Sequence, residues 1–470
     1  MPPRILLPLI VACALFMENL DSTILSTALP AIALDFNDSP IRLKLALTSY
    51  LLSLAVFIPA SGWLADRFSA RDVFRLAIIT FMAGSICCAL SQSIGQLVAA
   101  RVIQGLGGAM MVPVGRLLIL RNVEKSVLVS SMAWLTVPAL IGPIAGPPLG
   151  GFITTYFDWR YVFWINIPIG CLGVILASIH IPDTRSETVR PFDGLGFVLA
   201  GGGLALFVTS STSLGLHVLS MPVLAVLFAT GSAMLLAYYW HYRRTTDPIL
   251  DLSLFAIPTF AITVLGGSMF RLGVGAAPFL LPLMFQLAFG MSPFQSGSIT
   301  FVSAIGAIAM KFAVAPLLRR FGFRNLLIFN ALPAALFIAA PAFFSPAVPI
   351  ALILGVLLFG GFIRSLQFTL INSVAYADIS QERLSRATGM VSVIQQLALS
   401  LGISVGAIAL QISSAGSTTF TAATFTPAFV IIGALSSLSW LIFRLLPSDA
   451  GEEMSGRIRP DTVTAMRERG

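Results

Sequence analysis

The stretch that decides the fold is Cys13–Phe36, CALFMENLDSTILSTALPAIALDF, an apolar run that contains two carboxylates, Glu18 and Asp21. Because they are three residues apart, the two acids share one face of a helix. Ionisable side chains at membrane depth are costly and rare, and they mark proton relays or sites for ions and substrates. The other acidic residues occupy segment ends, connections or the carboxyl-terminal tail. If the protein handles protons through carboxylates, this pair is therefore the place.

The composition excludes a soluble domain. Of the 470 residues, 57% are hydrophobic and only 10% are charged, whereas a soluble domain carries about 25% charged residues. The apolar runs are roughly 20 to 28 residues long, which favours membrane helices over barrel strands. The net charge of +8 lies in short loops rather than in one basic cluster, so we expect a lipid bilayer and no nucleic acid as partner. The four cysteines lie inside apolar runs without metal-ligand spacing, so we expect neither a metal site nor disulfides.

Polar connections divide the chain into fourteen predicted helices. The least distinct connection lies between Ser210 and Pro222, where a short polar break separates the seventh helix from the eighth. The start of the chain has the outline of a signal peptide, but no small-residue cleavage site follows, so we expect an uncleaved first helix.

The cations indicate the orientation. With the amino terminus in the cytoplasm, 21 of the 28 Lys and Arg residues fall on the cytoplasmic side and only Arg42, Lys44 and Arg160 on the other. This bias follows the positive-inside rule and places both termini in the cytoplasm. The polar tail, residues 447–470, is predicted to be disordered. Four cations remain inside helices: Arg101, Arg271, Lys311 and Arg364.

An internal repeat suggests two related halves. WLADRFSARDVF at Trp63–Phe74 aligns with PLLRRFGFRNLL at Pro316–Leu327. Each copy joins the second and third helices of a six-helix unit if helices seven and eight are an insertion. The predicted fold is therefore an all-α polytopic membrane protein with 6+2+6 helices around a central cavity, a transporter architecture. The units are residues 1–180, an inserted pair at 181–255, residues 256–446 and the tail.

The loop after the second helix reads Gly62-Trp-Leu-Ala-Asp66-Arg67-Phe-Ser-Ala-Arg71. It resembles the G-x-L-A-D-R-x-G-R signature of the major facilitator superfamily. The resemblance implies a cytoplasmic gate at Gly62, Asp66, Arg67 and Arg71, in which the charged residues Asp66, Arg67 and Arg71 hold one conformation closed. A generic positive-inside loop would explain the arginines but not Gly62 and Asp66 at this spacing.

The fourth helix contains Arg101-Val-Ile-Gln104-Gly-Leu-Gly-Gly-Ala109, similar to the R-x-x-Q-G-x-G-x-A motif of that superfamily. Counting 1.5 Å per residue puts Asp21 about 22 Å from the inner face and Arg101 about 8 Å from the outer face. In a core of about 30 Å these are the same level. An interaction between Asp21 and Arg101 is therefore geometrically possible, directly or through water. The alternative is that Arg101 extends to the outer interface.

Two further motifs narrow the resemblance. Gly142, Pro143, Gly146 and Gly150 match the G-P-x-x-G-G motif of antiporters in the superfamily, although small residues also occur at ordinary helix contacts. Leu20–Pro30 resembles the signature of the fourteen-helix drug:proton antiporters, as do Asp158–Gly170 and Pro248–Phe255.

The resemblance implies proton-coupled efflux of amphipathic, drug-like molecules across a bacterial inner membrane, with no cofactor except the coupling ion H⁺. We expect a monomer; an accessory periplasmic adaptor cannot be inferred. Asp21 is assigned as the principal proton site, Glu18 as a second proton site or cation contact, and Arg101 as the group that tunes Asp21. Glu18 could instead be a hydrogen-bonded packing residue. Burial and a nearby arginine act in opposite directions on a carboxyl group, so protonation can respond to conformation.

The substrate is the least determined feature. The predicted cavity candidates are Gln104, Arg271, Gln286, Lys311, Arg364, Gln367, Asn372 and Gln395. Because Arg271, Lys311 and Arg364 have no opposing acid in the second half, an exporter of an organic anion or metabolite is the main alternative. A channel is a further alternative. An enzyme is disfavoured, because the three histidines are widely separated and no nucleophile pattern accompanies them.

Overall fold

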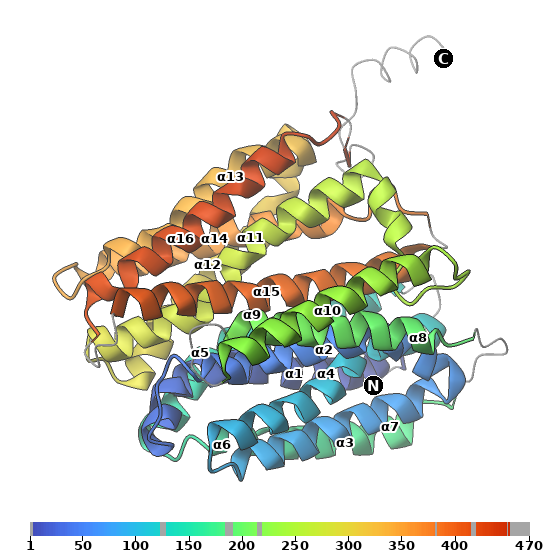
Figure 1. Cartoon of the computed structure of the whole chain (residues 1–470), viewed down its shortest axis with the longest axis horizontal. Coiled ribbons are helices and arrows are strands. Elements are labelled where there is room, and N and C mark those ends of the chain that lie inside the picture. Colours follow the sequence, from blue (N-terminus) through green and yellow to red (C-terminus); the bar gives the residue numbers. More distant parts are fainter. Residues whose placement is uncertain are drawn as a thin grey trace.

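The computed structural model describes residues 3–122, 128–183, 191–213, 219–380, 383–414, 420–448 and 450–451. Helices make up the regular structure of these residues (Figure 1). In chain order they are α1 (Pro3–Asp35), α2 (Lys44–Arg67), α3 (Ala70–Ala89), α4 (Ile94–Asn122), α5 (Leu128–Tyr156), α6 (Tyr161–Trp164), α7 (Asn166–His180), α8 (Gly194–Phe197), η2 (Val198–Gly202), α9 (Gly203–Ser213), α10 (Met221–Tyr242), η3 (Leu252–Ala256), α11 (Pro258–Leu283), η4 (Met284–Ala288), α12 (Pro293–Phe321), α13 (Phe323–Ala339), η5 (Ala340–Phe343), α14 (Ile350–Val374), α15 (Leu384–Ser414) and α16 (Ala422–Phe443).

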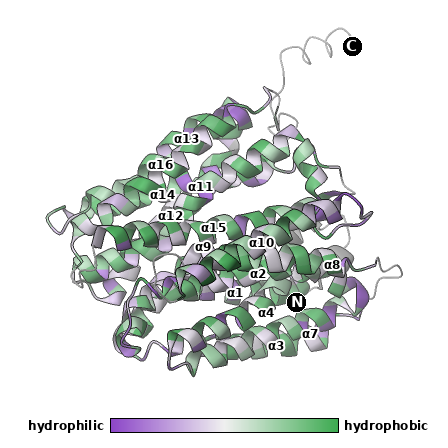
Figure 2. Ribbon diagram, viewed as in Figure 1, coloured by the Kyte–Doolittle hydropathy of each residue, from purple (hydrophilic) through white to green (hydrophobic). Residues whose placement is uncertain are grey.

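The chain is an integral membrane protein. Within the described residues, 13 helical segments are long and apolar enough to cross a bilayer. The 29-residue helix α5 is separate from these 13 and contains no charged residue. Hydrophilic residues gather at helix ends and connections, while the helix bodies are mostly hydrophobic (Figure 2). Helices suit this setting because each one satisfies its own backbone hydrogen bonds in lipid.

Local sequence determines where helix α12 begins and ends. Helix α12 begins at Pro293 after a capping box, in which Ser292 and Gln295 exchange side-chain and backbone hydrogen bonds. It ends at Phe321, and the next residue, Gly322, has a φ of 75°, which favours glycine. At the matching place in the first half, Ser69 is extended, with φ −178°, so a serine fits there without strain.

Helix pairing recurs in the two halves. The contacts α1–α5, α2–α4 and α3–α4 of the first half reappear as α11–α15, α12–α14 and α13–α14 in the second. The cross-contacts that join the halves, α5–α12 and α2–α15, are related in the same way. This repeated pairing agrees with the internal sequence repeat.

The helices between the halves pack as a pair. Helices α9 and α10 approach closely at Gly203 and Gly231, where the backbone of one helix meets the other. Helix α9 also packs against α2 and α15. In Figure 1 the pair lies over the seam formed by these two helices.

The connection between α10 and α11 is bound to the start of α15. Arg383 donates to Asp251 Oδ2 at 3.2 Å, and Arg386 lies 2.6 Å from Asp247. Asp251 is 7% exposed. Burial alone would raise the pKa of Asp251, but hydrogen bonds from Ser253 and Arg383 bring it below its usual value.

Two predictions concern weakly defined segments. The predicted break near Ser210 is present, because α9 ends at Ser213 and α10 begins at Met221. The predicted disorder of residues 447–470 concerns a tail of which only 447–448 and 450–451 are described, so that prediction lies outside the described residues.

Candidate functional site

A buried polar cluster surrounds Asp21 on α1. Asp21 and Arg101 are both 0% exposed, and Arg101 Nη1 lies 2.5 Å from Asp21 Oδ2. Gln104 and Asn166 donate side-chain amide hydrogens to Asp21 Oδ1 at 2.8 and 2.9 Å. The contact that depth arithmetic allowed between Asp21 and Arg101 is therefore direct.

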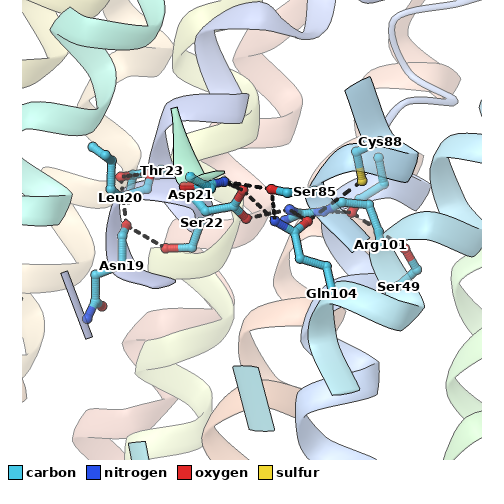
Figure 3. Close-up of polar contacts among 12 residues, drawn as sticks. Asn19, Leu20, Asp21, Ser22, Thr23, Ser49, Ser85, Cys88, Arg101 and Gln104 are labelled. Atoms are coloured by element: carbon cyan, nitrogen blue, oxygen red, sulfur yellow. Dashed lines mark hydrogen bonds and ion pairs between the residues drawn. The ribbon is translucent and has the colours of Figure 1, made fainter. Parts of the chain in front are cut away.

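A second layer fixes these donors. The hydroxyl of Ser85 on α3 accepts from Gln104 at 2.9 Å and from Asn166 at 2.8 Å. Figure 3 shows Ser85 between Asp21 and the side chains of α4. Because Asn166 is the first residue of α7, residues from α1, α3, α4 and α7 converge on one carboxyl group.

Arg101 is held by neutral groups as well. Its Nε donates to the Ala46 carbonyl of α2 at 3.1 Å, and its Nη1 lies 2.6 Å from Gln104 Oε1. Its guanidinium carbon lies 4.2 Å from the ring centroid of Tyr50, a cation–π distance.

The hydrogen-bond pattern around Asp21 is that of a carboxylate. Every hydrogen bond that the described residues make to its two oxygens comes from an N–H donor of Arg101, Gln104 or Asn166. A protonated carboxyl group would present its own O–H to one of these donors, so protonation requires a donor to move away. Arg101 is the candidate, because it also lines the central cavity.

Glu18 lies one turn before Asp21 on α1. Within the described part of the chain its Oε2 is buried without a hydrogen-bond partner. Glu18 is thus an acid inside the first bundle, one turn of helix away from the Asp21 cluster.

A cavity of about 930 Å³ lies between the two halves. Its wall comes from α1, α2, α4 and α5 on one side and from α11, α12, α14 and α15 on the other. Most of the wall is apolar, including Leu281, Ile308 and Phe368. A cavity of this size and character suits a drug-sized ligand.

Contacts between the halves close one end of the molecule. Near the carboxyl-terminal end of α1, Gln286 donates to the Thr27 carbonyl at 3.0 Å. Close by, the Phe294 amide donates to Thr155 at 3.0 Å. The cavity extends the other way as far as the last turn of α14, where Asn372 is exposed.

Helix α1 has two polar faces with different surroundings. Asn19, Ser22, Thr23 and Ser26 line the cavity, whereas Asp21 is directed into the first bundle. Arg101 and Tyr50 line the cavity too. Arg101 therefore connects the buried carboxylate with the space a ligand would occupy.

Three of the predicted cavity residues line this cavity: Lys311, Arg364 and Asn372. Arg271 is fully buried behind the wall, where its Nη2 donates to Asn372 Oδ1 at 2.7 Å. It contacts the cavity wall through Asn372 and through Phe368, whose ring centroid lies 5.7 Å from the guanidinium carbon.

The predicted glutamines lie elsewhere. Gln104 is part of the Asp21 cluster, and Gln286 bridges the halves at the closed end. Gln367 is fully buried and contacts Asn330 at 2.8 Å. Gln395 is half-buried on α15, and the described cavity wall does not include it.

The glycines of the α5 motif pack against α1. A Cβ atom at Gly142 would lie 2.9 Å from the Phe16 carbonyl oxygen, one at Gly146 would overlap Thr23, and one at Gly150 would overlap the Ile24 carbonyl. Pro143 and Pro147, in the same motif, line the cavity. The four-residue spacing therefore brings α5 against the helix that carries Asp21.

The predicted gate lies at the α2–α3 connection. Arg71 is 3.3 Å from Asp72 and 3.7 Å from Asp183. Arg67 and Gly62 are exposed, and a Cβ atom at Gly62 would meet no described atom within 4 Å. Asp66 is half-buried at the end of α2.

Sequence reasoning missed three members of the Asp21 cluster: Ser85, Asn166 and Tyr50. Asn166 had a usable signal, because it is an amide inside an apolar helix and within a recognised motif. Ser85 and Tyr50 had none, since serine and tyrosine are ordinary residues in membrane helices.

Comparison with known proteins places these features in context. The family model described as Major Facilitator Superfamily matches residues 11–277 and 263–467. "Putative multidrug resistance protein MdtD" of Serratia proteamaculans is 38% identical over 406 residues, covering 85% of this chain and 83% of that protein. The protein of the same name from Pectobacterium atrosepticum is 37% identical over 446 residues, covering 94% and 95%.

Solved structures share the fold at low identity. The crystal structure of a D-xylose-proton symporter aligns with a TM-score of 0.68 and 16% identity, covering 96% of this chain and 99% of that one. At this identity the likeness concerns the fold alone.

Proposed function

Because the chain belongs to the major facilitator superfamily, we propose that it exports small drug-like molecules in exchange for protons, as a member of the fourteen-helix drug:proton antiporters. It is a membrane transporter and not an enzyme. The MdtD relatives, named as multidrug resistance proteins, support drug efflux. The observation that carries proton coupling is the buried Asp21–Arg101 pair beside the central cavity.

The proposed architecture is 6+2+6. The 13 spanning segments and α5 make fourteen, with α9 and α10 in the inserted pair. The domains proposed are residues 1–180, 181–255 and 256–446, supported by the repeated helix pairing. The positive-inside bias supports cytoplasmic termini. With that orientation, the closed end is periplasmic and the cavity extends towards the cytoplasm.

The transport cycle begins with Asp21 ionised. In this conformation three donors hold the carboxylate, and a substrate can enter the cavity beside Arg101. When the halves rock and the cavity opens outward, the substrate leaves and Arg101 swings away from Asp21. A periplasmic proton then binds Asp21, and the neutral carboxyl group returns with the cavity empty. Loss of that proton to the cytoplasm restores the ion pair.

The membrane potential favours this direction. One charge moving inward gains about 2.3 kcal/mol per 100 mV. Glu18, whose Oε2 is buried one helical turn from Asp21, is proposed as a second proton site. Residues Gly62, Asp66, Arg67 and Arg71 are proposed to form the cytoplasmic gate. No cofactor other than H⁺ is required, and a monomer in the bacterial inner membrane suffices.

Transport in proteoliposomes tests the proposal. With an imposed pH gradient, the wild type should accumulate at least one of two probes, the lipophilic cation tetraphenylphosphonium and the organic anion 2-naphthalenesulfonate, against its own gradient. Asp21→Asn should abolish accumulation while retaining exchange of substrate down its gradient. Accumulation by Asp21→Asn at the wild-type rate would show that Asp21 does not couple protons to transport.

A further inference from the structure

The charge of the cavity wall is unbalanced. Among the described residues that line it, three are cationic, Arg101, Lys311 and Arg364, and none is acidic. The charge of Arg101 is balanced by Asp21. Lys311 and Arg364 therefore leave two positive charges beside the space where a substrate would bind.

Both of these cations are held by hydroxyl groups. Lys311 Nζ donates to Thr369 Oγ1 at 2.9 Å, and Arg364 Nη2 donates to Ser303 Oγ at 3.2 Å. In the described part of the chain, neither side chain forms an ion pair. Neutral hydroxyls orient a cation without neutralising it, so both side chains keep their positive charge at the cavity wall.

The two cations face the same space because α12 and α14 pack side by side in register. Ser365 Oγ donates to the Ala307 carbonyl at 2.9 Å, which sets Lys311 level with Thr369. Arg364 reaches back to Ser303, so the two cationic groups are roughly 8–12 Å apart along the helices. Lys311 lies towards the open end of the cavity and Arg364 lies deeper.

A neutral donor completes the polar wall. Because Arg271 donates to Oδ1 of Asn372, the amide nitrogen of Asn372 is left to donate to a ligand. Around this wall the surface is apolar, with Phe312 and Phe368 among its members. The wall thus offers hydrogen-bond donors and positive charge for one part of a ligand and aromatic surface for the rest.

We propose that the substrates of this transporter carry an acidic group, a carboxylate or sulfonate, on an apolar body, and that Arg364 and Lys311 bind this group between α12 and α14. The inference rests on the proposed function, because it assigns a substrate class to the same cavity. Lys311 receives the anion near the open end, and Arg364 holds it in the deeper position with a bidentate contact.

Equilibrium binding of 2-naphthalenesulfonate tests the inference directly. The purified full-length protein in neutral detergent should bind this permanent anion, and 2-naphthalenesulfonamide, its neutral counterpart, should bind at least about tenfold more weakly. Lys311→Gln and Arg364→Gln should each lower sulfonate affinity about tenfold or more and leave the sulfonamide unchanged. Lys311→Arg should retain most of the affinity, and Arg364→Lys should retain part of it, because lysine keeps the charge but cannot make the bidentate contact. Arg319→Gln, which removes an exposed cation from the same helix outside the cavity, is the matched control.

Two results would overturn the inference: equal affinity for sulfonate and sulfonamide, or sulfonate affinity that the two glutamine variants do not change. Phosphatidylglycerol is added in a parallel titration, because a lipid phosphate is also an anion. Competition by this lipid at the same two residues would assign the site to lipid and refute the substrate class.

A transport assay distinguishes a failure of this inference from a failure of the proposed function. If the protein binds the sulfonate through Lys311 and Arg364 but moves no compound under a pH gradient, the binding site stands and proton-coupled efflux fails. If the pH gradient drives tetraphenylphosphonium but neither binding nor transport of the sulfonate is found, efflux stands and the anionic substrate class is wrong. Lys311→Glu, which reverses one charge, should favour the cation over the anion relative to the wild type.

Discussion

The α5 glycines give a prediction whose magnitude follows from the packing. A methyl group at Gly146 would overlap Thr23 Oγ1 and lie 2.8 Å from Thr23 Cβ. Rotation of the threonine can relieve the first contact but not the second, so α1 and α5 must separate. Overpacking of this kind costs about 3 kcal/mol at the upper end of its range. The higher helix propensity of alanine offsets about 1 kcal/mol.

Gly146→Ala should therefore lower the free energy of unfolding by about 2 kcal/mol. Gly62→Ala is the matched control, because the described atoms leave open space around a Cβ atom there. It should stabilise α2 by up to about 1 kcal/mol. Thr23→Ala combined with Gly146→Ala should recover part of the loss, because it removes the overlapping hydroxyl.

The assay is reversible unfolding in mixed micelles titrated with a denaturing detergent, followed by circular dichroism. The reasoning is refuted if Gly146→Ala and Gly62→Ala differ by less than about 0.5 kcal/mol, the usual range of surface substitutions. It is also refuted if Thr23→Ala adds to the damage of Gly146→Ala instead of relieving it.

Three further predictions follow from other sites. The pKa of Asp251 is below its usual value, so Asp251→Asn should be less stable than the wild type at pH 6–7. In melting experiments the difference in stability should vanish as the pH falls well below about 4. A difference that does not depend on pH would contradict the role of the Asp251 charge. Asn166→Leu removes hydrogen bonds to Asp21 and Ser85, so it should lower the free energy of unfolding by about 1–3 kcal/mol and slow transport. Wild-type stability and transport would contradict the role of Asn166 in the Asp21 cluster. Lys44 is 0% exposed, and its Nζ has no hydrogen-bond partner among the described residues. Lys44→Met should therefore raise the free energy of unfolding by about 1–2 kcal/mol. A lower free energy of unfolding would indicate that Lys44 forms an ion pair.

Much of the fold could be predicted, because a membrane helix requires an apolar run of a certain length with polar residues at its ends. The break before Met221 was predicted from the polar residues after Ser210, and it separates α9 from α10. The packing of the helices against one another is harder to predict from the sequence. The repeat indicated two halves, but nothing local to α9 and α10 indicates that they cover the seam between α2 and α15.

The site was predictable where a residue is unusual for its environment. Asp21 and Arg101 are charges in apolar helices, and the rise per residue placed them at one level. Ser85 and Tyr50 carry no such signal, because serine and tyrosine are ordinary residues in membrane helices. Gln104 and Gln367 were grouped as cavity candidates, and only the packed structure distinguishes the buried networks that hold them from the cavity wall that contains Asn372.

Substrate-induced proton release tests the central claim most directly. The purified protein is held in weakly buffered solution with a pH indicator at a pH where substrate and proton compete, and substrate is added. The account predicts that the wild type releases protons, that Asp21→Asn binds substrate without releasing the coupling proton, and that Glu18→Gln retains at least part of the release. Undiminished release from Asp21→Asn would contradict the claim that Asp21 carries the proton.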